Sequence, residues 1–123
     1  DKISRWLLDD SRIGEVYYPG LEQHPGHQIA ARQMSAPGGM VSFVLADASE
    51  QHAREMVSRT EIFTLAESLG GVESLIEHPV SMTHGAIPPE VRAAAGLSDA
   101  LIRLSVGIED VEDLVEDLDK AIG

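Results

Sequence analysis

Apolar and polar residues follow two different spacings along this chain, and together these spacings predict alternating helices and strands. Segments with apolar residues three and four positions apart are expected to form amphipathic helices: 3–13, 24–34, 49–57, 88–95 and 110–122. Runs of apolar, β-branched or aromatic residues are expected to form strands: 16–18, 40–45, 62–66 and 101–106. The stretch 72–87 shows neither spacing and contains Pro79, so we expect mainly loop there.

Two details of this pattern give specific expectations about buried faces. Ile13 is expected to complete the apolar stripe of the first helix, and Gly14 is expected to end that helix. Ile29, Ala30 and Met34 are expected to line the buried face of the second helix.

The interleaving of helices and strands predicts one α+β domain over residues 1–123. No Gly-rich phosphate loop follows any expected strand, so the pattern does not indicate a dinucleotide-binding sheet. We therefore expect a small, largely antiparallel sheet covered by helices. A length of 123 residues suits a single domain, and no internal repeat or linker divides the chain.

The composition adds a strongly acidic balance. Nine Lys and Arg residues against 21 Asp and Glu residues give a formal net charge of −12. Nucleic acids and anionic membranes require a cationic surface, so neither is an expected partner. Cysteine is absent, and no apolar run approaches the ~20 residues that a membrane helix needs. No signal peptide is visible either, and we expect a cytoplasmic location.

Arg103 is the most informative single residue for function. Strand alternation places it on one face with Leu101 and Ser105, and it places Ile102 and Leu104 on the other face. Its planar guanidinium can bind a carboxylate or a phosphate through two parallel hydrogen bonds. The pattern alone favours the structural alternative, which is an ion pair with one of the acidic residues of the chain.

A second candidate site follows the strand expected at 62–66. Glu67 and Ser68 place a carboxylate and a hydroxyl at the end of that strand, and Gly70 and Gly71 allow a ligand to approach the backbone. The structural alternative is a turn with an exposed glutamate, and the pattern alone favours that alternative.

Neither a metal site nor a covalent cofactor site is expected in these residues. His24 and His27 have the spacing of paired ligands, but a Pro-Gly pair separates them at a helix start, and no zinc signature includes them. The two lysines, Lys2 and Lys120, lie near the ends of the sequence, where a buried Schiff-base lysine is not expected.

Six segments in a fixed order resemble a known enzyme family. They are Tyr17-Tyr18-Pro19-Gly20-Leu21, His24-Pro25-Gly26-His27, Gly38-Gly39-Met40-Val41-Ser42-Phe43, Ala66-Glu67-Ser68-Leu69-Gly70-Gly71-Val72-Glu73-Ser74-Leu75, Met82-Thr83-His84 and Ile102-Arg103-Leu104-Ser105-Val106-Gly107-Ile108-Glu109-Asp110. Together they resemble the C-terminal domain of the cystathionine γ-synthase and γ-lyase family, the pyridoxal-phosphate enzymes of cysteine and methionine metabolism. The resemblance covers essentially the whole chain, and six segments in order are far more specific than any one of them.

The resemblance implies that these residues are the small C-terminal domain of a longer fold-type I enzyme. In this family a large N-terminal domain carries the lysine that binds pyridoxal 5'-phosphate and most of the other cofactor contacts. The chain alone is therefore expected to be inactive and to bind no cofactor. The expected partners are the large domain, an amino-acid substrate and, at full length, the other subunits of a homotetramer.

The resemblance also implies roles for particular residues. Arg103 matches the arginine that pairs with the α-carboxylate of the substrate. Ser68 and Thr83 match residues near the same site, and Leu69 lies beside Ser68. Glu67 matches a position that varies with specificity, and an acid there is similar to the γ-synthase and γ-lyase branches.

Among these branches the resemblance favours cystathionine γ-synthase over γ-lyase. The expected reaction is a γ-replacement, in which an O-acylhomoserine loses its acyl group and cysteine adds to give cystathionine. Met82-Thr83-His84-Gly85 is similar to bacterial γ-synthases, although Gly85 departs from the more common Ala. The alternative function is a standalone α+β module that binds a ligand or a protein without catalysis.

Overall fold

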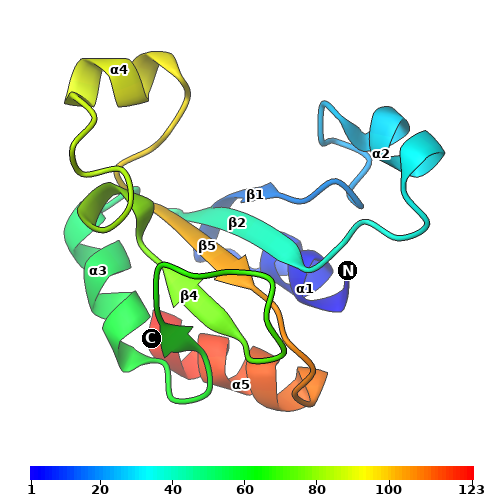
Figure 1. Ribbon diagram of the computed structural model, residues 1–123. Helices are drawn as coiled ribbons and strands as arrows, with labels where there is room; N and C mark the ends of the chain where they lie inside the picture. The colour runs from blue at the N-terminus through cyan, green and yellow to red at the C-terminus, as the bar shows by residue number, and fades with distance from the viewer.

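A five-stranded sheet forms the centre of the molecule, which the computed structural model describes over residues 1–123 (Figure 1). The strands are β1 (Ile13–Tyr17), β2 (Met40–Leu45), β3 (Thr64–Leu65), β4 (Leu75–Glu77) and β5 (Leu101–Ser105). They lie in the order β1-β2-β5-β4-β3, and every neighbouring pair is antiparallel except β3 and β4. The largely antiparallel sheet confirms the predicted α+β class.

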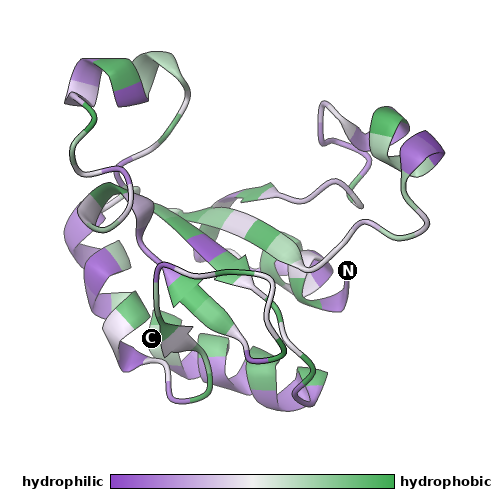
Figure 2. Cartoon of the chain, viewed as in Figure 1, coloured by the Kyte–Doolittle hydropathy of each residue, from purple (hydrophilic) through white to green (hydrophobic).

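Three helices pack against one side of the sheet, and two shorter helices extend away from it (Figure 1). The helices are α1 (Lys2–Asp9), α2 (His27–Gln33), α3 (Glu50–Arg59), α4 (Pro89–Ala94) and α5 (Val111–Ile122), and a short 3₁₀ helix, η1 (Pro79–Ser81), follows β4. The packed helices are α1, α3 and α5, whereas α2 and α4 project as separate arms. Figure 2 shows that hydrophobic residues dominate the strands and that hydrophilic residues mark the outer sides of α3 and α5.

The core lies between the sheet and the three packed helices. Its largest contributors are buried residues of α1, β2, α3, β5 and α5: Ile3, Leu7, Phe43, Met56, Ile102, Leu104, Leu114 and Leu118. Ile102 and Leu104 point into this core, so Arg103 between them lies on the opposite face of β5.

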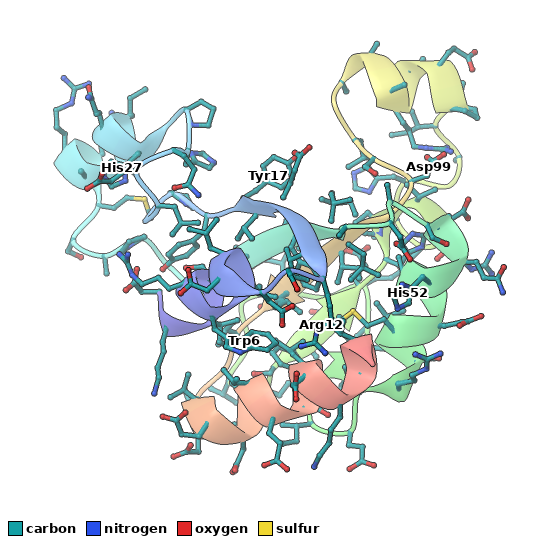
Figure 3. All side chains as sticks on the ribbon, turned by 180° about the vertical axis from the view of Figure 1, so that it is seen from behind. Trp6, Arg12, Tyr17, His27, His52 and Asp99 are labelled. Atoms are coloured by element: carbon teal, nitrogen blue, oxygen red, sulfur yellow. The ribbon has the colours of Figure 1, made fainter.

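The first helix is shorter than the sequence predicts. It ends at Asp9, and Ile13 begins β1, so the placement of Ile13 in the helix was wrong. Asp10 adopts an extended conformation, and its Oδ1 accepts hydrogen bonds of 2.9 Å from the backbone N–H and from Nε of Arg12. These bonds turn the chain toward β1. Arg12 also pairs with Asp119, and Figure 3 shows it beside α5.

Two further expectations were wrong. The segment 72–87 is not mainly loop, because it contains β4, whose residues are all buried and pair with β5 and β3. Three residues are too few to show a periodic pattern in the sequence. In α2, Ile29 and Met34 are exposed rather than buried, since this helix projects from the body of the molecule (Figure 1).

Candidate functional site

Arg103 lies in the middle of β5, which is the central strand of the sheet. It is paired with Ser42 of β2 on one side and with Glu77 of β4 on the other. Two hydrogen-bonded neighbours hold the backbone under Arg103 in a fixed position, which suits a residue that must orient a ligand. Its side chain is 19% exposed, so the guanidinium is accessible from the face opposite the packed helices.

The loop that follows β3 lies over this guanidinium. Nη2 of Arg103 donates hydrogen bonds to the carbonyl oxygens of Glu67 at 3.3 Å and Ser68 at 3.5 Å. The backbone N–H of Gly70 donates to Oγ of Ser105 at 2.7 Å, which ties the loop to the same face of β5. The two candidate motifs of the sequence are therefore one site. The contact uses backbone carbonyls, while the residues Glu67 and Ser68 themselves are exposed.

Glu77 completes the site, and sequence reasoning did not single it out. Its Oε2 lies 2.7 Å from Nη2 of Arg103, and the residue is almost fully buried. The ion pair considered as the structural alternative for Arg103 therefore exists, and Arg103 nevertheless faces Glu67 and Ser68. The available signal was an acidic residue directly after the apolar pair Leu75-Ile76, in a segment expected to be loop.

Arg103 retains hydrogen-bonding capacity after these contacts. The carboxylate of Glu77 and the two loop carbonyls all converge on Nη2. Nε and Nη1 donate to no protein group. A guanidinium carries five N–H donors in one plane. This arrangement can therefore bind a further carboxylate or phosphate while Nη2 stays anchored to the protein.

Thr83 is not joined to Arg103, Glu67 or Ser68 by a hydrogen bond. It follows η1, and its hydroxyl lies 2.7 Å from Nδ1 of His84. The 3₁₀ helix packs against β5, so this segment lies near the sheet, but Thr83 itself is exposed. The role that the resemblance implies for Thr83 stays a prediction.

Exposed apolar side chains lie around the same loop. Leu69, Val72 and Ile108 are 54%, 71% and 82% exposed. The backbone N–H of Ile108 donates to the carbonyl of Val72 at 2.9 Å, so these two residues are neighbours. Exposed apolar side chains that gather at one place are typical of a contact surface.

The histidines contribute to turns rather than to a common centre. Nδ1 of His24 accepts a hydrogen bond of 3.0 Å from the N–H of Gly26, and Nδ1 of His27 lies 2.8 Å from the carbonyl of Pro19. No group of three or more His, Cys, Asp or Glu residues is placed to hold a metal ion. None of the helices combines the length and the apolar character needed to span a membrane.

Comparison with known proteins gives one consistent result. The family described as "Cys/Met metabolism PLP-dependent enzyme" matches residues 1–123. The chain is 54% identical over 121 residues to a cystathionine beta-lyase of Lactococcus lactis subsp. cremoris, covering 98% of this chain and 31% of that protein. It is 52% identical over 120 residues to a cystathionine gamma-lyase of Mus musculus, covering 98% of this chain and 30% of that protein.

A solved structure agrees with these relatives. The crystal structure of a cystathionine gamma synthase from Xanthomonas oryzae pv. oryzae in complex with cystathionine superimposes with a TM-score of 0.90 and 53% sequence identity. The match covers 98% of this chain and 31% of that one. The chain thus spans about a third of the length of the proteins it matches, and these carry the names of three different activities.

Proposed function

This chain belongs to the family of Cys/Met metabolism PLP-dependent enzymes, and from that premise we propose that it is the part of a longer transsulfuration enzyme that binds the α-carboxylate of an amino-acid substrate. The observation that carries the proposal is the geometry of Arg103. Its guanidinium is anchored through Nη2, while Nε and Nη1 donate to no protein group. A chain with a net charge of −12 needs such a fixed cation to attract an anionic substrate.

The residues of this chain do not fit covalent binding of pyridoxal phosphate. Covalent attachment needs a positioned, desolvated amine, whereas Lys2 and Lys120 are exposed and paired with Glu112 and Glu116. In the proposed full-length enzyme the cofactor is held by the preceding large domain and supplies the electron sink for the reaction. The task of residues 1–123 is to bind and orient the substrate through Arg103.

We further propose that the reaction is the γ-replacement of a cystathionine γ-synthase. The exposed acid Glu67 at the edge of the Arg103 site supports this assignment, since an acid there resembles the γ-synthase and γ-lyase branches. The similarity to the cystathionine gamma synthase of Xanthomonas oryzae supports it as well. The substrates would be an O-acylhomoserine and cysteine, and the product cystathionine.

The surface around the site has a place in this proposal. Leu69, Val72 and Ile108 would contact the remainder of the longer enzyme, because exposed apolar side chains gather at such interfaces. The resemblance implies a homotetramer and a cytoplasmic location for the complete protein. Ser68 and Thr83 would border the substrate beside Arg103.

Substitution of Arg103 in the full-length enzyme tests the carboxylate site. Removing one member of a desolvated charged pair costs on the order of 2–5 kcal/mol, so Arg103→Ala should lower kcat/KM by roughly 30-fold to several thousand-fold. Arg103→Lys should recover part of the loss, because it restores the charge without the two-pronged geometry. The absorbance of the bound cofactor should stay unchanged in both variants.

The control is Arg54→Ala, which removes an exposed arginine of α3 that forms only a surface pair with Glu50. Arg54→Ala should leave kcat/KM at the wild-type level. Near-normal kcat/KM in Arg103→Ala would reject the carboxylate site. Comparing kcat/KM for O-acyl-L-homoserine plus cysteine with that for cystathionine cleavage tests the γ-synthase assignment separately.

A further inference from the structure

Glu77 is a buried carboxylate that the fold does not use as a structural cap. Its side chain is only 1% exposed, and neither Oε1 nor Oε2 accepts an aligned hydrogen bond. The other buried acid, Asp117, differs, because it accepts three backbone N–H groups. A buried carboxylate without hydrogen bonds is unfavourable unless a positive charge compensates it. For Glu77 that charge is Arg103, whose Nη2 lies 2.7 Å from Oε2.

The position of this pair in the sheet fixes its direction. Glu77 and Arg103 are partners in the antiparallel register of β4 and β5, so their side chains project from the same face. Glu77 lies toward the interior, whereas Arg103 extends to the accessible side of the same row. The attraction therefore acts on the guanidinium from below, and the loop carbonyls of Glu67 and Ser68 contact the same nitrogen.

We propose that Glu77 is a positioning residue for Arg103, an inference that rests on the proposed function of Arg103 as the carboxylate-binding residue. Glu77 holds Nη2 toward the sheet and thereby fixes the plane in which the remaining N–H groups meet the substrate. Glu77 itself touches no substrate. Without its charge, the flexible arginine side chain gains other orientations, and a carboxylate must select the productive one at a cost in affinity.

A pair of ligands separates this role from a general loss of structure. L-Homoserine and 3-aminopropanol differ only in the α-carboxylate, so the ratio of their Kd values measures the contribution of the carboxylate site. Both Kd values are measured on the full-length holoenzyme by the change in cofactor absorbance. In Glu77→Gln, the Kd for L-homoserine should rise about 10- to 100-fold, as expected when an orienting contact is lost. The Kd for 3-aminopropanol should change less than about twofold, because that ligand makes no use of Arg103.

Matched variants complete the experiment. Glu73→Gln makes the same chemical change at an exposed residue of the preceding loop and should leave both Kd values unchanged. In an Arg103→Ala background, adding Glu77→Gln should produce less than a twofold further change, because Glu77 acts only through Arg103. If Glu77→Gln does not yield folded holoenzyme, Glu77→Asp is judged by the same criteria, since it withdraws the carboxylate by one methylene and keeps the charge.

The outcomes distinguish the two proposals. If Arg103→Ala keeps the preference for L-homoserine over 3-aminopropanol, the proposed function fails and the role of Glu77 fails with it. If Arg103→Ala loses this preference and Glu77→Gln or Glu77→Asp retains it, only the positioning role is overturned. Equal weakening of both ligands by the Glu77 variants also overturns it, because that result describes general damage to the fold.

Discussion

The carboxylate of Asp117 on α5 holds the backbone of Phe63 just before β3. Oδ2 of Asp117 accepts hydrogen bonds of 2.9 Å from the N–H groups of Ile62 and Phe63, and Oδ1 accepts one of 2.7 Å from Glu61. These three donors are thus satisfied by a side chain rather than by a neighbouring strand. The contact also fixes the start of the chain segment that leads, through β3, to the carbonyls over Arg103.

Asp117→Ala should lower the free energy of unfolding of the chain by about 2–4 kcal/mol. The substitution leaves three backbone N–H groups without their acceptor, one of which is buried. Urea unfolding followed by circular dichroism measures this change. Glu116→Ala is the control on the same helix, because its pair with Lys120 is exposed and should contribute less than about 0.5 kcal/mol. Similar stabilities of the two variants would contradict the structural role of Asp117.

Gly107→Ala should destabilise the chain because the loop before β4 passes directly over this glycine. A Cβ at position 107 would overlap the carbonyl oxygen of Val72 and lie 2.6 Å from the carbonyl carbon of Glu73. Neither backbone atom can move without displacing the segment that enters β4, and such overpacking costs about 1–3 kcal/mol. Thermal unfolding checks the prediction. Gly71→Ala, which meets no atom within 4 Å, should change stability by less than about 1 kcal/mol.

The sequence predicts the long elements well because their patterns are local. The expected strands at 40–45 and 101–106 agree with β2 and β5 to within one residue, and the final helix begins after Asp110, whose carboxylate accepts a hydrogen bond from the N–H of Glu112. The strand expected at 62–66 is reduced to Thr64–Leu65, because Asp117 takes the N–H groups that a longer strand would have used. That competition is a long-range contact and leaves no local pattern.

The candidate site shows the same division between local and distant information. Alternation alone placed Arg103 on the face away from the core, and the structure confirms that placement. Glu77 escaped notice because β4 is a strand only through its pairing with β5 and β3. The contacts of Arg103 to Glu67 and Ser68 use backbone carbonyls, which every residue has, so no side-chain pattern could predict them.

The contribution of His52 to stability should decrease as the pH rises above neutrality. A hydrogen bond to Asp47, at 2.7 Å, and the carbonyl of Ile122 at the end of α5 raise the pKa of His52 above its ordinary value. A raised pKa in the folded state means that this stabilisation is complete below the ordinary pKa of His. It is lost as the pH rises through the higher pKa of the folded chain. Because His52 is partly exposed, the effect should be about 0.5 kcal/mol.

Measuring the melting temperature of the wild type and of His52→Asn between about pH 5.5 and 8.5 tests this dependence. The difference between the two should be largest at the acidic end and should shrink toward the alkaline end. His84→Asn is the control, since the side chain of His84 bonds to Thr83 and to no carboxylate. A difference that is constant with pH, or that grows with pH, would show that protonated His52 does not stabilise the end of α5.

The chain of 123 residues should form no stoichiometric covalent adduct with pyridoxal phosphate at a single lysine. Attachment requires a neutral amine, and the hydrogen bond to Glu116 raises the pKa of Lys120 above its ordinary value. Lys2 is exposed and paired with Glu112, so it too lacks the desolvated setting that lowers the pKa of a reactive lysine. Incubation with the cofactor, reduction with borohydride and mass spectrometry of the peptides measure this directly. The full-length enzyme, treated in parallel, should carry one reduced adduct outside these residues. Complete labelling of Lys2 or Lys120 would instead place covalent cofactor chemistry within this chain and remove the division of tasks on which the role of Arg103 depends.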